Sequence, residues 1–470
     1  MKLLHTEVKN TVPGFNDEKK IETEYLAARQ INPKPLLILD DDPTGIQTVH
    51  GISLYTQWDI KIMQGIFRKR ETAFILTNTR AFHPEKATAI ISEIMLNALK
   101  VSQETGIDFE IISRSDSTLR GHWPLETSLI RDMYEKFKGK RIDGEIMIPF
   151  FCEGGRFTIN NIHYVAEGDY LIPASETEFA KDPNFSFQNA DLKKYIEEKT
   201  NGQISEEKVH VISLDMLRKG DSDEIENLLM NVKYFEKVIL NALEYKDIKT
   251  FIPPLFRAIS KGKKFLYRTA ASFVKTMAFV DDKPLLSVND FKNFKPKGNQ
   301  LLIIAGSYTA KTTSQLTPLI ENQLVEAIEI DIFHLLDKKD YMHYVDEVLP
   351  RLNRALTSKK NVLLYTSRTL VKTKDHLYAS KIISDFIITL VKNITNPPDM
   401  IIAKGGITSH VIAVEALEIT HATVKGQVLP GVPAIIAGKR GKWPGMPYVI
   451  FPGNVGDDQS LLKIVEKFGL

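Results

Sequence analysis

The sequence predicts an α/β protein made of two α/β domains, each with a mostly parallel sheet flanked by helices. Short β-branched apolar runs alternate with amphipathic stretches along the chain, which is typical of a parallel sheet covered by helices. The apolar runs also form two series, separated by a polar stretch near residue 290. The length of 470 residues exceeds the ~100–200 residues of an ordinary domain, so two domains are expected.

The first series of apolar runs predicts the sheet of the N-terminal domain. Between these runs, helical periodicity at residues 87–100 and 222–234 predicts amphipathic helices. The polar residues 1–30 are expected to form an N-terminal arm or a surface helix, which leaves residues 31–282 for the domain itself. The predicted strands cover residues 36–39, 73–77, 109–113, 145–149, 209–213 and 237–241.

The second series predicts the sheet of the C-terminal domain. It follows the lysine-rich stretch FKNFKPKGNQ, so we expect a linker over residues 283–298 and a domain over residues 299–470. No internal repeat or low-complexity tract is evident. The predicted strands cover residues 301–305, 326–330, 361–365, 400–403, 433–437 and 448–451.

Composition excludes several classes of function. The 61 basic and 59 acidic side chains leave a net charge of +2, which gives no electrostatic reason to expect nucleic acid or an anionic membrane. No apolar run reaches the ~18 residues of a membrane span, and the first residues lack a signal-peptide core. The single cysteine, Cys152, allows no internal disulfide or thiolate cluster, and we expect an inert core residue there. A cytoplasmic protein with small-molecule partners is expected.

Three consecutive aspartates, residues 40–42, follow the first predicted strand. Neighbouring carboxylates repel one another and are costly to ionise where water is scarce, so a cation or a chemical role is usually needed to justify them. The alternative is an exposed strand-to-loop corner, where aspartate simply favours the turn. This segment alone leaves both interpretations open.

Polar loops follow other strands of the first domain as well. They cover residues 77–80, 113–122 and 152–156 and carry hydroxyls and several arginines. Ligands of open parallel sheets bind beyond the carboxyl ends of the strands. Guanidinium groups suit a carboxylate or phosphate, and hydroxyl and amide groups suit sugar hydroxyls. A small, polar, anionic ligand is therefore predicted, although each loop by itself could be a surface turn.

Glycine-rich loops occupy the corresponding positions of the second domain, at residues 306–313, 404–409 and 452–457. A strand followed by glycines, hydroxyls and a helix N-terminus can hold phosphate, because free N–H groups and the helix dipole meet the negative charge. None of these loops is a Walker A motif or a G-x-G-x-x-G fingerprint. Three of them in one domain predict a nucleotide or a polyphosphate.

A different function is also consistent with the first loop. Asp40-x-Asp42-x-Thr44 fits the D-x-D-x-T opening of haloacid-dehalogenase-type phosphatases, with Asp40 as nucleophile and Asp42 as acid/base. Asp281-Asp282 would then be a candidate magnesium pair. This alternative leaves the loop at residues 114–122 and the glycine-rich second half without a role.

Eight motifs occur in consistent order between about residues 35 and 460, and with them the chain resembles the four-carbon acid sugar kinase family. The motifs are DDPTG (41–45), RSDSTLRGH (114–122), CEGGRFTINNIHYV (152–165), SETEFAKDP (175–183), FLYRTAASF (265–273), AGSYTAKTTSQL (305–316), KGGITS (404–409) and PGNVGD (452–457).

The resemblance implies an ATP-dependent kinase that phosphorylates a hydroxyl of a tetronate or 3-oxo-tetronate. It implies that the N-terminal domain binds the sugar acid, that the C-terminal domain binds ATP with Mg²⁺, and that a cleft between the domains holds the active site. No metal ligand is assigned, and a homo-oligomer is left open.

The motifs and the mechanism together assign the site residues. Asp41 and Asp42 are the candidate catalytic pair, either of which would act as general base. The candidate substrate-binding residues are Arg114, Ser115, Asp116, Ser117, Arg120, Gly121 and Arg268. The candidate nucleotide-binding residues are Ser307, Lys404, Gly405, Gly406, Ile407, Thr408, Gly453 and Asn454.

The sequence departs from the family pattern at three positions. Pro43 replaces the usual leucine, Arg114 replaces a common lysine, and Ile407 stands where many members carry an acidic residue. The last change puts any metal or ribose contact at that position in question. The substrate could therefore differ from the characterised sugar acids, and a non-catalytic protein that binds a sugar acid and a nucleotide is a further alternative.

Overall fold

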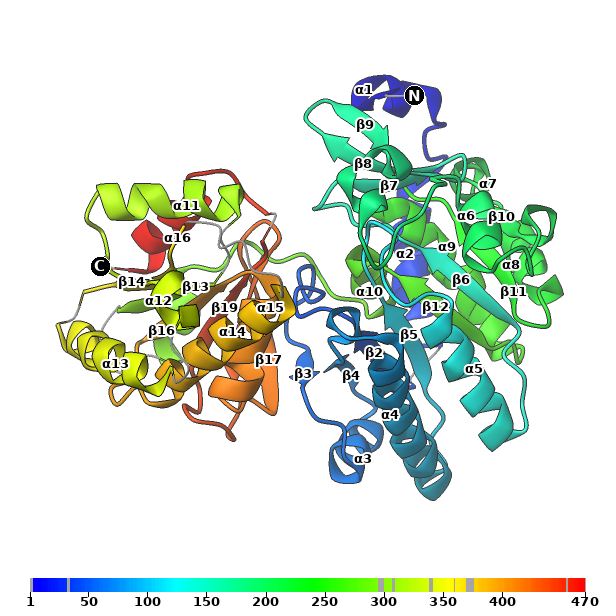
Figure 1. The fold of residues 1–470 in the computed structure, drawn as a ribbon. Helices are drawn as coiled ribbons and strands as arrows, with labels where there is room; N and C mark the ends of the chain where they lie inside the picture. Colours follow the sequence, from blue (N-terminus) through cyan, green and yellow to red (C-terminus); the bar gives the residue numbers. More distant parts are fainter. Residues whose placement is uncertain are drawn as a thin grey trace. The chain divides into compact units, whose positions relative to one another are not determined.

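The computed structural model describes residues 3–31, 34–294, 300–306, 309–337, 341–358, 360–368, 376–453 and 455–469 (Figure 1). The chain divides into two compact units. Unit 1 consists of Met1–Gly45 and Gln57–Asp281, and unit 2 consists of Ile46–Thr56 and Asp282–Leu470. Each unit contains a large sheet flanked by helices, so the predicted α/β class with two domains is confirmed.

The main sheet of unit 1 is parallel, with the strand order β10-β11-β6-β12-β5-β2-β4. All six predicted strands are present, with ends displaced by no more than one residue. Strand β12, which lies between β5 and β6, is not among the predicted strands because the charged Arg268 interrupts its apolar run. The strands are β2 (Leu36–Asp40), β4 (Thr72–Leu76), β5 (Glu110–Arg114), β6 (Gly144–Ile148), β10 (His210–Ile212), β11 (Glu236–Leu240) and β12 (Phe265–Thr269).

Two groups of helices flank this sheet. One group is α3 (Ile60–Lys69), α4 (Pro84–Thr105) and α5 (Leu125–Lys138), which pack on one another. The other packs around α9 (Tyr245–Ser260). Figure 1 shows α4 and α5 in front of the strands. The helices packed around α9 are α2 (Glu18–Ala28), α7 (Leu214–Lys219), α8 (Ser222–Asn231) and α10 (Ala271–Met277). A further helix of unit 1 is α6 (Leu192–Lys199).

A small antiparallel sheet with the order β1-β9-β8-β7 completes unit 1. The hairpin of β7 and β8, at one edge of this sheet, turns at Asn160 and Asn161, whose φ angles are 49° and 68°. Two-residue hairpins need this left-handed backbone, and asparagine tolerates it better than most residues. The strands are β1 (Leu3–Leu4), β7 (Arg156–Ile159), β8 (Ile162–Glu167) and β9 (Tyr170–Pro173).

The N-terminal segment is part of unit 1 rather than a separate arm. Helix α1 (His5–Thr11) follows β1, and α2 packs along α9. Tyr25 of α2 is 5% exposed, stacks on Phe279 at 4.7 Å, and donates its hydroxyl to the Thr276 carbonyl at 2.8 Å. Lys246 and Lys249 of α9 form ion pairs with Glu18 and Glu22. The polar composition that suggested an arm therefore belongs to the outer face of a docked helix.

Unit 2 contains a mixed sheet with the order β3-β17-β18-β19-β16-β13-β15-β14. The strands from β19 to β14 are parallel, and β18, β17 and β3 are antiparallel to their neighbours. All six predicted strands of this half are present. The strands are β3 (Ser53–Tyr55), β13 (Leu301–Ala305), β14 (Glu326–Ile330), β15 (Val362–Thr366), β16 (Met400–Lys404), β17 (His421–Leu429), β18 (Val432–Ala437) and β19 (Pro447–Phe451).

Helices cover both faces of the unit 2 sheet. Helices α11 (Ala310–Glu321) and α16 (Ser460–Phe468) pack together on one side, where they share a hydrophobic core with β13 and β16. Figure 1 shows α13 and α14 along the other side. Of these two, α13 covers Met342–Thr357 and α14 covers His376–Lys392. The other helices of unit 2 are α12 (Ile332–Asp337), α15 (Gly406–Val411) and a π-helix (Ile412–Ala416).

Residues 46–56, which we expected in the first domain, belong to unit 2. Strand β3 pairs antiparallel with β17, with Tyr55 opposite His421. The Thr56 hydroxyl donates to the Ile419 carbonyl at 2.6 Å. The chain therefore enters unit 2 directly after the DDPTG motif and returns to unit 1 at Gln57. A three-residue strand whose partner is far away in the sequence leaves no local pattern, so sequence reasoning missed this exchange.

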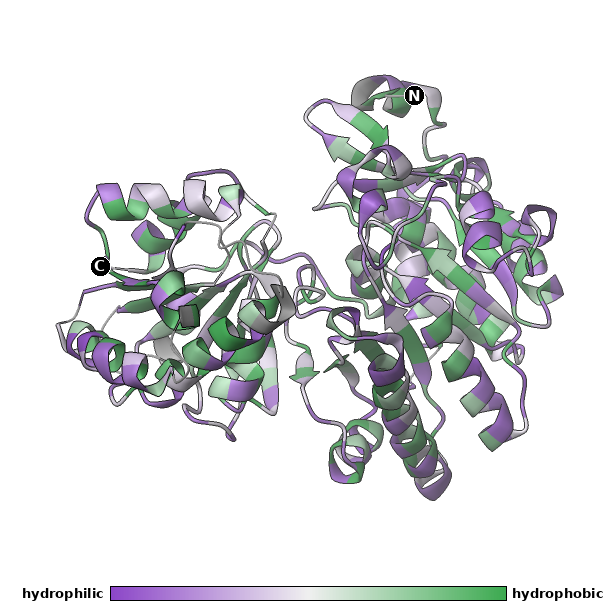
Figure 2. Cartoon of the chain, viewed as in Figure 1, coloured by the Kyte–Doolittle hydropathy of each residue, from purple (hydrophilic) through white to green (hydrophobic). Residues whose placement is uncertain are grey.

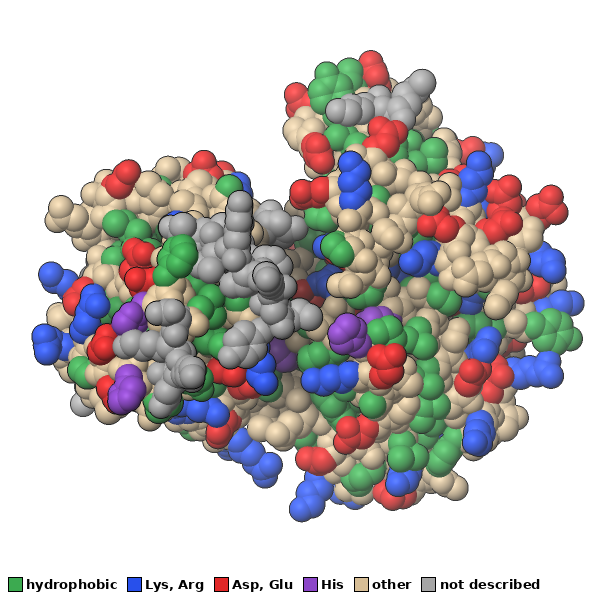
Figure 3. All heavy atoms as spheres, viewed as in Figure 1, with side chains coloured by type: hydrophobic (Ala, Val, Ile, Leu, Met, Phe, Trp, Pro, Cys, Tyr) green, Lys and Arg blue, Asp and Glu red, His purple; other side chains and the backbone are tan. Residues whose placement is uncertain are grey.

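Apolar and charged residues are distributed as in a globular α/β protein. Figure 2 shows mostly hydrophobic strands within each sheet and mostly hydrophilic outer faces on the helices. Figure 3 shows basic and acidic side chains interspersed on the visible surface, in keeping with the small net charge. Among the described residues, no helix has both the length and the hydropathy that membrane crossing requires.

We expect Tyr25→Ala to destabilise unit 1. The substitution removes a buried ring and its hydrogen bond to Thr276, which should lower the free energy of unfolding by about 3–5 kcal/mol. Urea denaturation followed by circular dichroism measures this change. Tyr170→Ala is the matched control, because Tyr170 is 48% exposed and its loss should change stability little. Equal stability of the two variants would show that α2 is only loosely attached.

Candidate functional site

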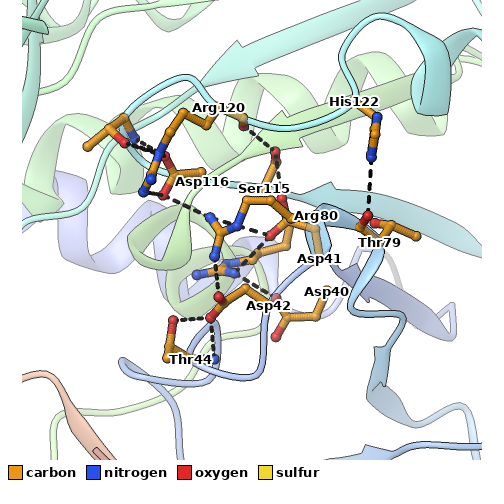
Figure 4. Close-up of polar contacts among 12 residues, drawn as sticks. Asp40, Asp41, Asp42, Thr44, Thr79, Arg80, Ser115, Asp116, Arg120 and His122 are labelled. Carbon is orange, nitrogen blue, oxygen red and sulfur yellow. Dashed lines mark hydrogen bonds and ion pairs between the residues drawn. The ribbon is translucent and has the colours of Figure 1, made fainter. Parts of the chain in front are cut away.

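The carboxyl ends of the central strands of unit 1 bring its polar loops together. Asp40, at the end of β2, lies opposite Leu76 of β4 and Arg114 of β5, and Arg114 lies opposite Thr269 of β12. The loops that follow these strands therefore begin side by side. Figure 4 shows their side chains converging in one group.

Asp40 and Asp41 form the buried part of this group. Asp40 is fully buried, and the Arg114 guanidinium donates to it at 2.7 Å and to Asp41 at 3.4 Å. Burial raises the pKa of Asp40 to about 7, although Arg114 acts in the opposite direction. Burial also raises the pKa of Asp41, which accepts a hydrogen bond from the Ser115 hydroxyl at 3.2 Å. These two carboxylates are interior groups that Arg114 neutralises.

Asp42 is the most accessible of the three aspartates, with 18% of its side chain exposed. The Thr44 backbone N–H donates to it at 2.7 Å, the Thr44 hydroxyl also donates to it, and Arg80 forms an ion pair with it. Burial acts to raise the pKa of Asp42, but Arg80, Arg114 and the Thr44 hydrogen bonds outweigh it and hold the pKa below its usual value. Asp42 is therefore an ionised carboxylate with a fixed orientation and access to solvent.

Arg80 links the aspartates to the loop after β5. It lies in the 3₁₀ turn Thr79–Ala81 that follows β4, and it forms ion pairs with Asp42 and, at 2.9 Å, with Asp116. Our site prediction omitted Arg80, although it noted the polar loop that contains it. The sequence did contain a signal for Arg80. Like the predicted residues, Arg80 follows the carboxyl end of a strand in this sheet.

The loop after β5 is held in shape by Asp116. Its carboxylate accepts hydrogen bonds from Arg120 Nε at 2.9 Å and from the Thr118 hydroxyl. Burial acts against ionisation, but Arg80 and Arg120 hold the pKa of Asp116 well below its usual value. Gly121 has a φ of 117°, and a Cβ atom there would lie 2.8 Å from Ser115 Oγ. Glycine is therefore required by both the backbone conformation and the close approach.

Two other predicted substrate residues support this loop. Arg268 is fully buried on β12 and donates to the carbonyls of Asp116 at 3.2 Å and Arg120 at 3.0 Å. The carbonyl of Ser117 pairs with His163 Nε2 at 2.7 Å. Arg268 was predicted either to contact the substrate or to form an ion pair on a helix surface; its guanidinium instead bonds to backbone carbonyls of the loop after β5.

The glycine-rich loops of unit 2 also start side by side. Ala305 of β13 lies opposite Lys404 of β16, which lies opposite Phe451 of β19. Lys404 is fully buried, and its ammonium donates to the carbonyls of Pro452 at 2.7 Å and Gly453 at 3.2 Å. Burial, with a smaller contribution from Lys311, lowers the pKa of Lys404 to about 7. The predicted residues Ser307 and Asn454 lie outside the described residues.

The loop after β16 turns sharply into α15. Gly405 has a φ of 103°, and its N–H donates to the Phe451 carbonyl at 2.8 Å. Gly406 is the first residue of α15, and Ser409 Oγ donates to the Gly405 carbonyl at 2.8 Å. A Cβ atom at Gly306 would lie 3.0 Å from Thr408 Oγ1, so the loops after β13 and β16 are in close contact. Ile407 is 61% exposed.

The acidic cluster does not fit a divalent metal ion as it stands. Asp42 and Asp116 bond to arginine and threonine, and Arg114 neutralises Asp40. Among the described residues, no group of three or more histidine, cysteine, aspartate or glutamate side chains could hold a metal ion. The cations that compensate the three aspartates are arginines, so these carboxylates are not the ligands of a magnesium ion in this arrangement.

The structure also disfavours the phosphatase alternative. A Cβ atom at Gly45 would lie 2.2 Å from Asp40 Oδ1, so the backbone of the DDPTG turn closes over the proposed nucleophile. Asp281 and Asp282, the suggested magnesium pair, are exposed, and each belongs to a different unit.

Comparison with protein families identifies both halves of the chain. Residues 36–277 match the sugar-binding N-terminal domain, and residues 302–461 match the nucleotide-binding C-terminal domain. The chain belongs to the four-carbon acid sugar kinase family. Sugar binding is thus the family property of the half with the aspartate–arginine cluster, and nucleotide binding is that of the half with the glycine-rich loops.

Two solved structures have a fold similar to that of this chain. A Haemophilus influenzae protein of the DUF1537 family is 18% identical, covers 92% of this chain and 100% of its own, and has a TM-score of 0.63. A Salmonella typhimurium LT2 protein, whose description proposes a tRNA synthase, is 15% identical, covers 93% and 100%, and has a TM-score of 0.65. No curated protein matches the chain. At these identities the likeness shows the fold alone.

We expect Gly45→Ala to destabilise the protein by about 1–3 kcal/mol, because its methyl group would overlap the buried Asp40 carboxylate. Gly65→Ala is the matched control. Gly65 lies within α3 and a Cβ atom there meets nothing within 4 Å, so alanine should raise stability by about 0.5–1 kcal/mol through its helix propensity. Thermal unfolding of both variants tests the pair. A Gly45→Ala protein as stable as wild type would contradict the close packing of the turn on Asp40.

Proposed function

We propose that this chain is an ATP-dependent kinase that phosphorylates a hydroxyl group of a small sugar acid of the tetronate or 3-oxo-tetronate class. One observation carries the proposal. In the sugar-binding domain, a cluster of ion-paired aspartates and arginines holds the carboxylate of Asp42 ionised with 18% of its side chain exposed, the most of the three consecutive aspartates. The second domain of the same chain belongs to a nucleotide-binding family, which supplies the phosphoryl donor that a sugar kinase needs.

Asp42 is the proposed general base. Phosphoryl transfer depends mainly on positioning and charge neutralisation, so the base chiefly orients the attacking hydroxyl and receives its proton late. A lowered pKa is compatible with this role, because the proton moves only as the new bond forms. The two hydrogen bonds from Thr44 and the ion pair with Arg80 fix the direction of the carboxylate. Asp41, the other candidate, is 3% exposed and serves better as an internal charge.

The arginines of the cluster have separate proposed roles. Arg114 and Arg268 are buried and bonded to protein groups, so they position Asp40, Asp41 and the loop after β5. Arg80 and Arg120 are partly exposed, at 17% and 24% of their side chains, and can contact substrate. The hydroxyl of Ser115 and the backbone of Gly121 lie beside Asp41 and shape the same region.

The glycine-rich loops are the proposed phosphate-binding elements. Backbone N–H groups at residues 406–408 and the loop at Gly453 would meet the phosphates of ATP, with Lys404 supplying positive charge, whereas the Gly405 N–H already donates to the Phe451 carbonyl. Mg²⁺ bound to the nucleotide would neutralise the developing phosphate charge. The phosphoryl group must pass directly from the nucleotide to the hydroxyl, so turnover requires both domains.

We expect Asp42→Asn to lower kcat at least about 100-fold, because asparagine keeps the shape of the side chain but cannot accept the hydroxyl proton. An ATP-consumption assay over four-carbon and related sugar acids measures this loss. The KM for ATP should remain within about twofold, since Asp42 belongs to the sugar-binding domain. Asp132→Asn, an exposed aspartate on α5, is the matched control and should retain full activity.

Two outcomes would count against this assignment. Normal turnover by Asp42→Asn would exclude Asp42 as the base. Tight binding of both a sugar acid and ATP by the wild-type protein, without turnover of any acid in the panel, would instead favour a binding protein over a kinase.

Nucleotide binding should be coupled to proton uptake by Lys404. Its pKa of about 7 leaves it mostly neutral at pH 8, and a bound phosphate would raise that pKa and restore the charge. We therefore expect uptake of up to about one proton per ATP at pH 8, and affinity that falls as pH rises from 7 to 9. Calorimetry in buffers of different ionisation enthalpy measures the uptake. Lys404→Met should abolish the proton uptake. If this variant took up as many protons as the wild-type protein, Lys404 would not be the group that is protonated on ATP binding.

A further inference from the structure

Arg156 differs from the arginines of the aspartate–arginine cluster because its guanidinium has no hydrogen bond or ion pair to another described residue. It is the first residue of β7 and follows the C-E-G-G segment of a family motif. Within the part of the chain that the structure describes, its guanidinium makes no hydrogen bond and no ion pair, and its Nε atom is buried without a partner. The Nε atoms of Arg114 and Arg268 are also buried without a partner, but other nitrogens of these two guanidinium groups donate to carboxylates or carbonyls.

Arg156 lies beside the loop that carries Asp116 and Arg120. Its Cζ atom is 5.8 Å from the centre of the Phe179 ring, and Arg120 Cζ is 5.0 Å from the same ring. Arg120 is already paired, with Asp116 at 2.9 Å and with Asp182 at 3.5 Å. One aromatic ring therefore holds two guanidinium groups, of which Arg120 has carboxylate partners and Arg156 has none among the described residues.

This arrangement has an energetic cost that a ligand would remove. Arg156 is half-buried, and a charged guanidinium that is partly withdrawn from water without a hydrogen-bond partner loses part of its hydration without compensation. Burial lowers the pKa of Arg156, Asp116 and Glu167 act against that shift, and the like charge of Arg120 adds to it. Buried polar groups without partners are uncommon in folded proteins and frequently mark places where a ligand completes the hydrogen bonding.

The side chain is also held in place for binding. The backbone N–H of Arg156 donates to the Phe151 carbonyl at 2.9 Å, and its own carbonyl accepts from the Phe151 N–H at 3.0 Å. A Cβ atom at the preceding Gly155 would lie 2.8 Å from the Ala166 methyl, so the turn packs closely on β8. With the backbone fixed and the guanidinium on the Phe179 ring, little freedom remains to be lost on binding.

We propose that Arg156 is a specificity-determining residue that binds the carboxylate group of the sugar-acid substrate. The planar guanidinium fork matches a carboxylate with two parallel hydrogen bonds, and one negative charge compensates the one unpaired cation. This inference rests on the proposed function for its substrate class, and it adds a residue outside the set predicted from the motifs. It also explains how an acid would be preferred over the uncharged polyol of the same length.

Arg156→Met and Arg156→Lys test the inference by binding alone. Calorimetric titrations with threonate and erythronate, and with the matching polyols threitol and erythritol, give the preference for acid over polyol. We expect Arg156→Met to weaken acid binding about 10- to 100-fold and leave polyol binding unchanged, so the preference collapses. Arg156→Lys keeps the positive charge but lacks the planar guanidinium, so its preference for acid over polyol should lie between those of the wild-type protein and Arg156→Met. In turnover assays KM for the acid should rise while kcat stays within about threefold.

Arg141→Met, on the surface of the same unit, is the matched control and should bind as wild type does. Circular dichroism and the thermal midpoint show whether each variant is folded, and if Arg156→Met does not fold, the preference of Arg156→Lys decides. Equal loss of acid and polyol binding would mean a structural role and overturn the inference, as would an unchanged preference or a wild-type protein that binds neither acid. If acid binding depended on Arg156 but no acid were turned over, the carboxylate-binding role of Arg156 would be supported and the kinase proposal would be overturned.

Discussion

The pairing of aspartates with arginines at the end of β2 is the interaction on which the site depends. Three consecutive carboxylates cannot be held together in a poorly hydrated place unless cations compensate them. Arg114 supplies the charge beneath Asp40, and Arg80 connects Asp42 to Asp116 across the neighbouring loop. Removing one partner of such a buried pair typically costs about 3–5 kcal/mol, because an unpaired charge remains. The cluster therefore fixes the loops of the sugar-binding domain as well as the orientation of its proposed base.

The two units handle charge in opposite ways. In unit 1, arginines form ion pairs with the aspartates of the cluster around Asp42, whereas the guanidinium of Arg156 has no hydrogen bond or ion pair among the described residues. In unit 2, the buried Lys404 bonds to backbone carbonyls, and a lowered pKa is the consequence of burial without a negative partner among the described residues. Each unit thus contains a cationic group that an anionic ligand would stabilise. A sugar carboxylate and a nucleotide phosphate are ligands with that charge, which is consistent with the domain families of the two halves.

Much of the fold could be predicted because buried parallel strands leave a distinctive pattern. Their apolar runs are continuous, and all twelve predicted strands are present. The missed elements have physical reasons. Arg268 interrupts the run of β12, and its charge is tolerated there only because carbonyls of the loop above accept its hydrogen bonds. Strand β3 is three residues long and depends on β17 for its pairing, so its own residues carry little information about where it lies.

The sequence by itself determined the α/β class, the family and the loops that form the candidate sites, because these follow from local apolar patterns and from motifs in a consistent order. Only the tertiary structure decided which groups are paired. Arg114 meets Asp40 across 74 residues of chain, and Arg268 meets Asp116 across 152. Whether a carboxylate is buried, ionised or open to solvent depends on such encounters, since charge and hydrogen bonding act over a few ångströms in space and not along the chain. For that reason the accessibility of Asp42, the bridging role of Arg80 and the unpaired state of Arg156 became evident only in three dimensions.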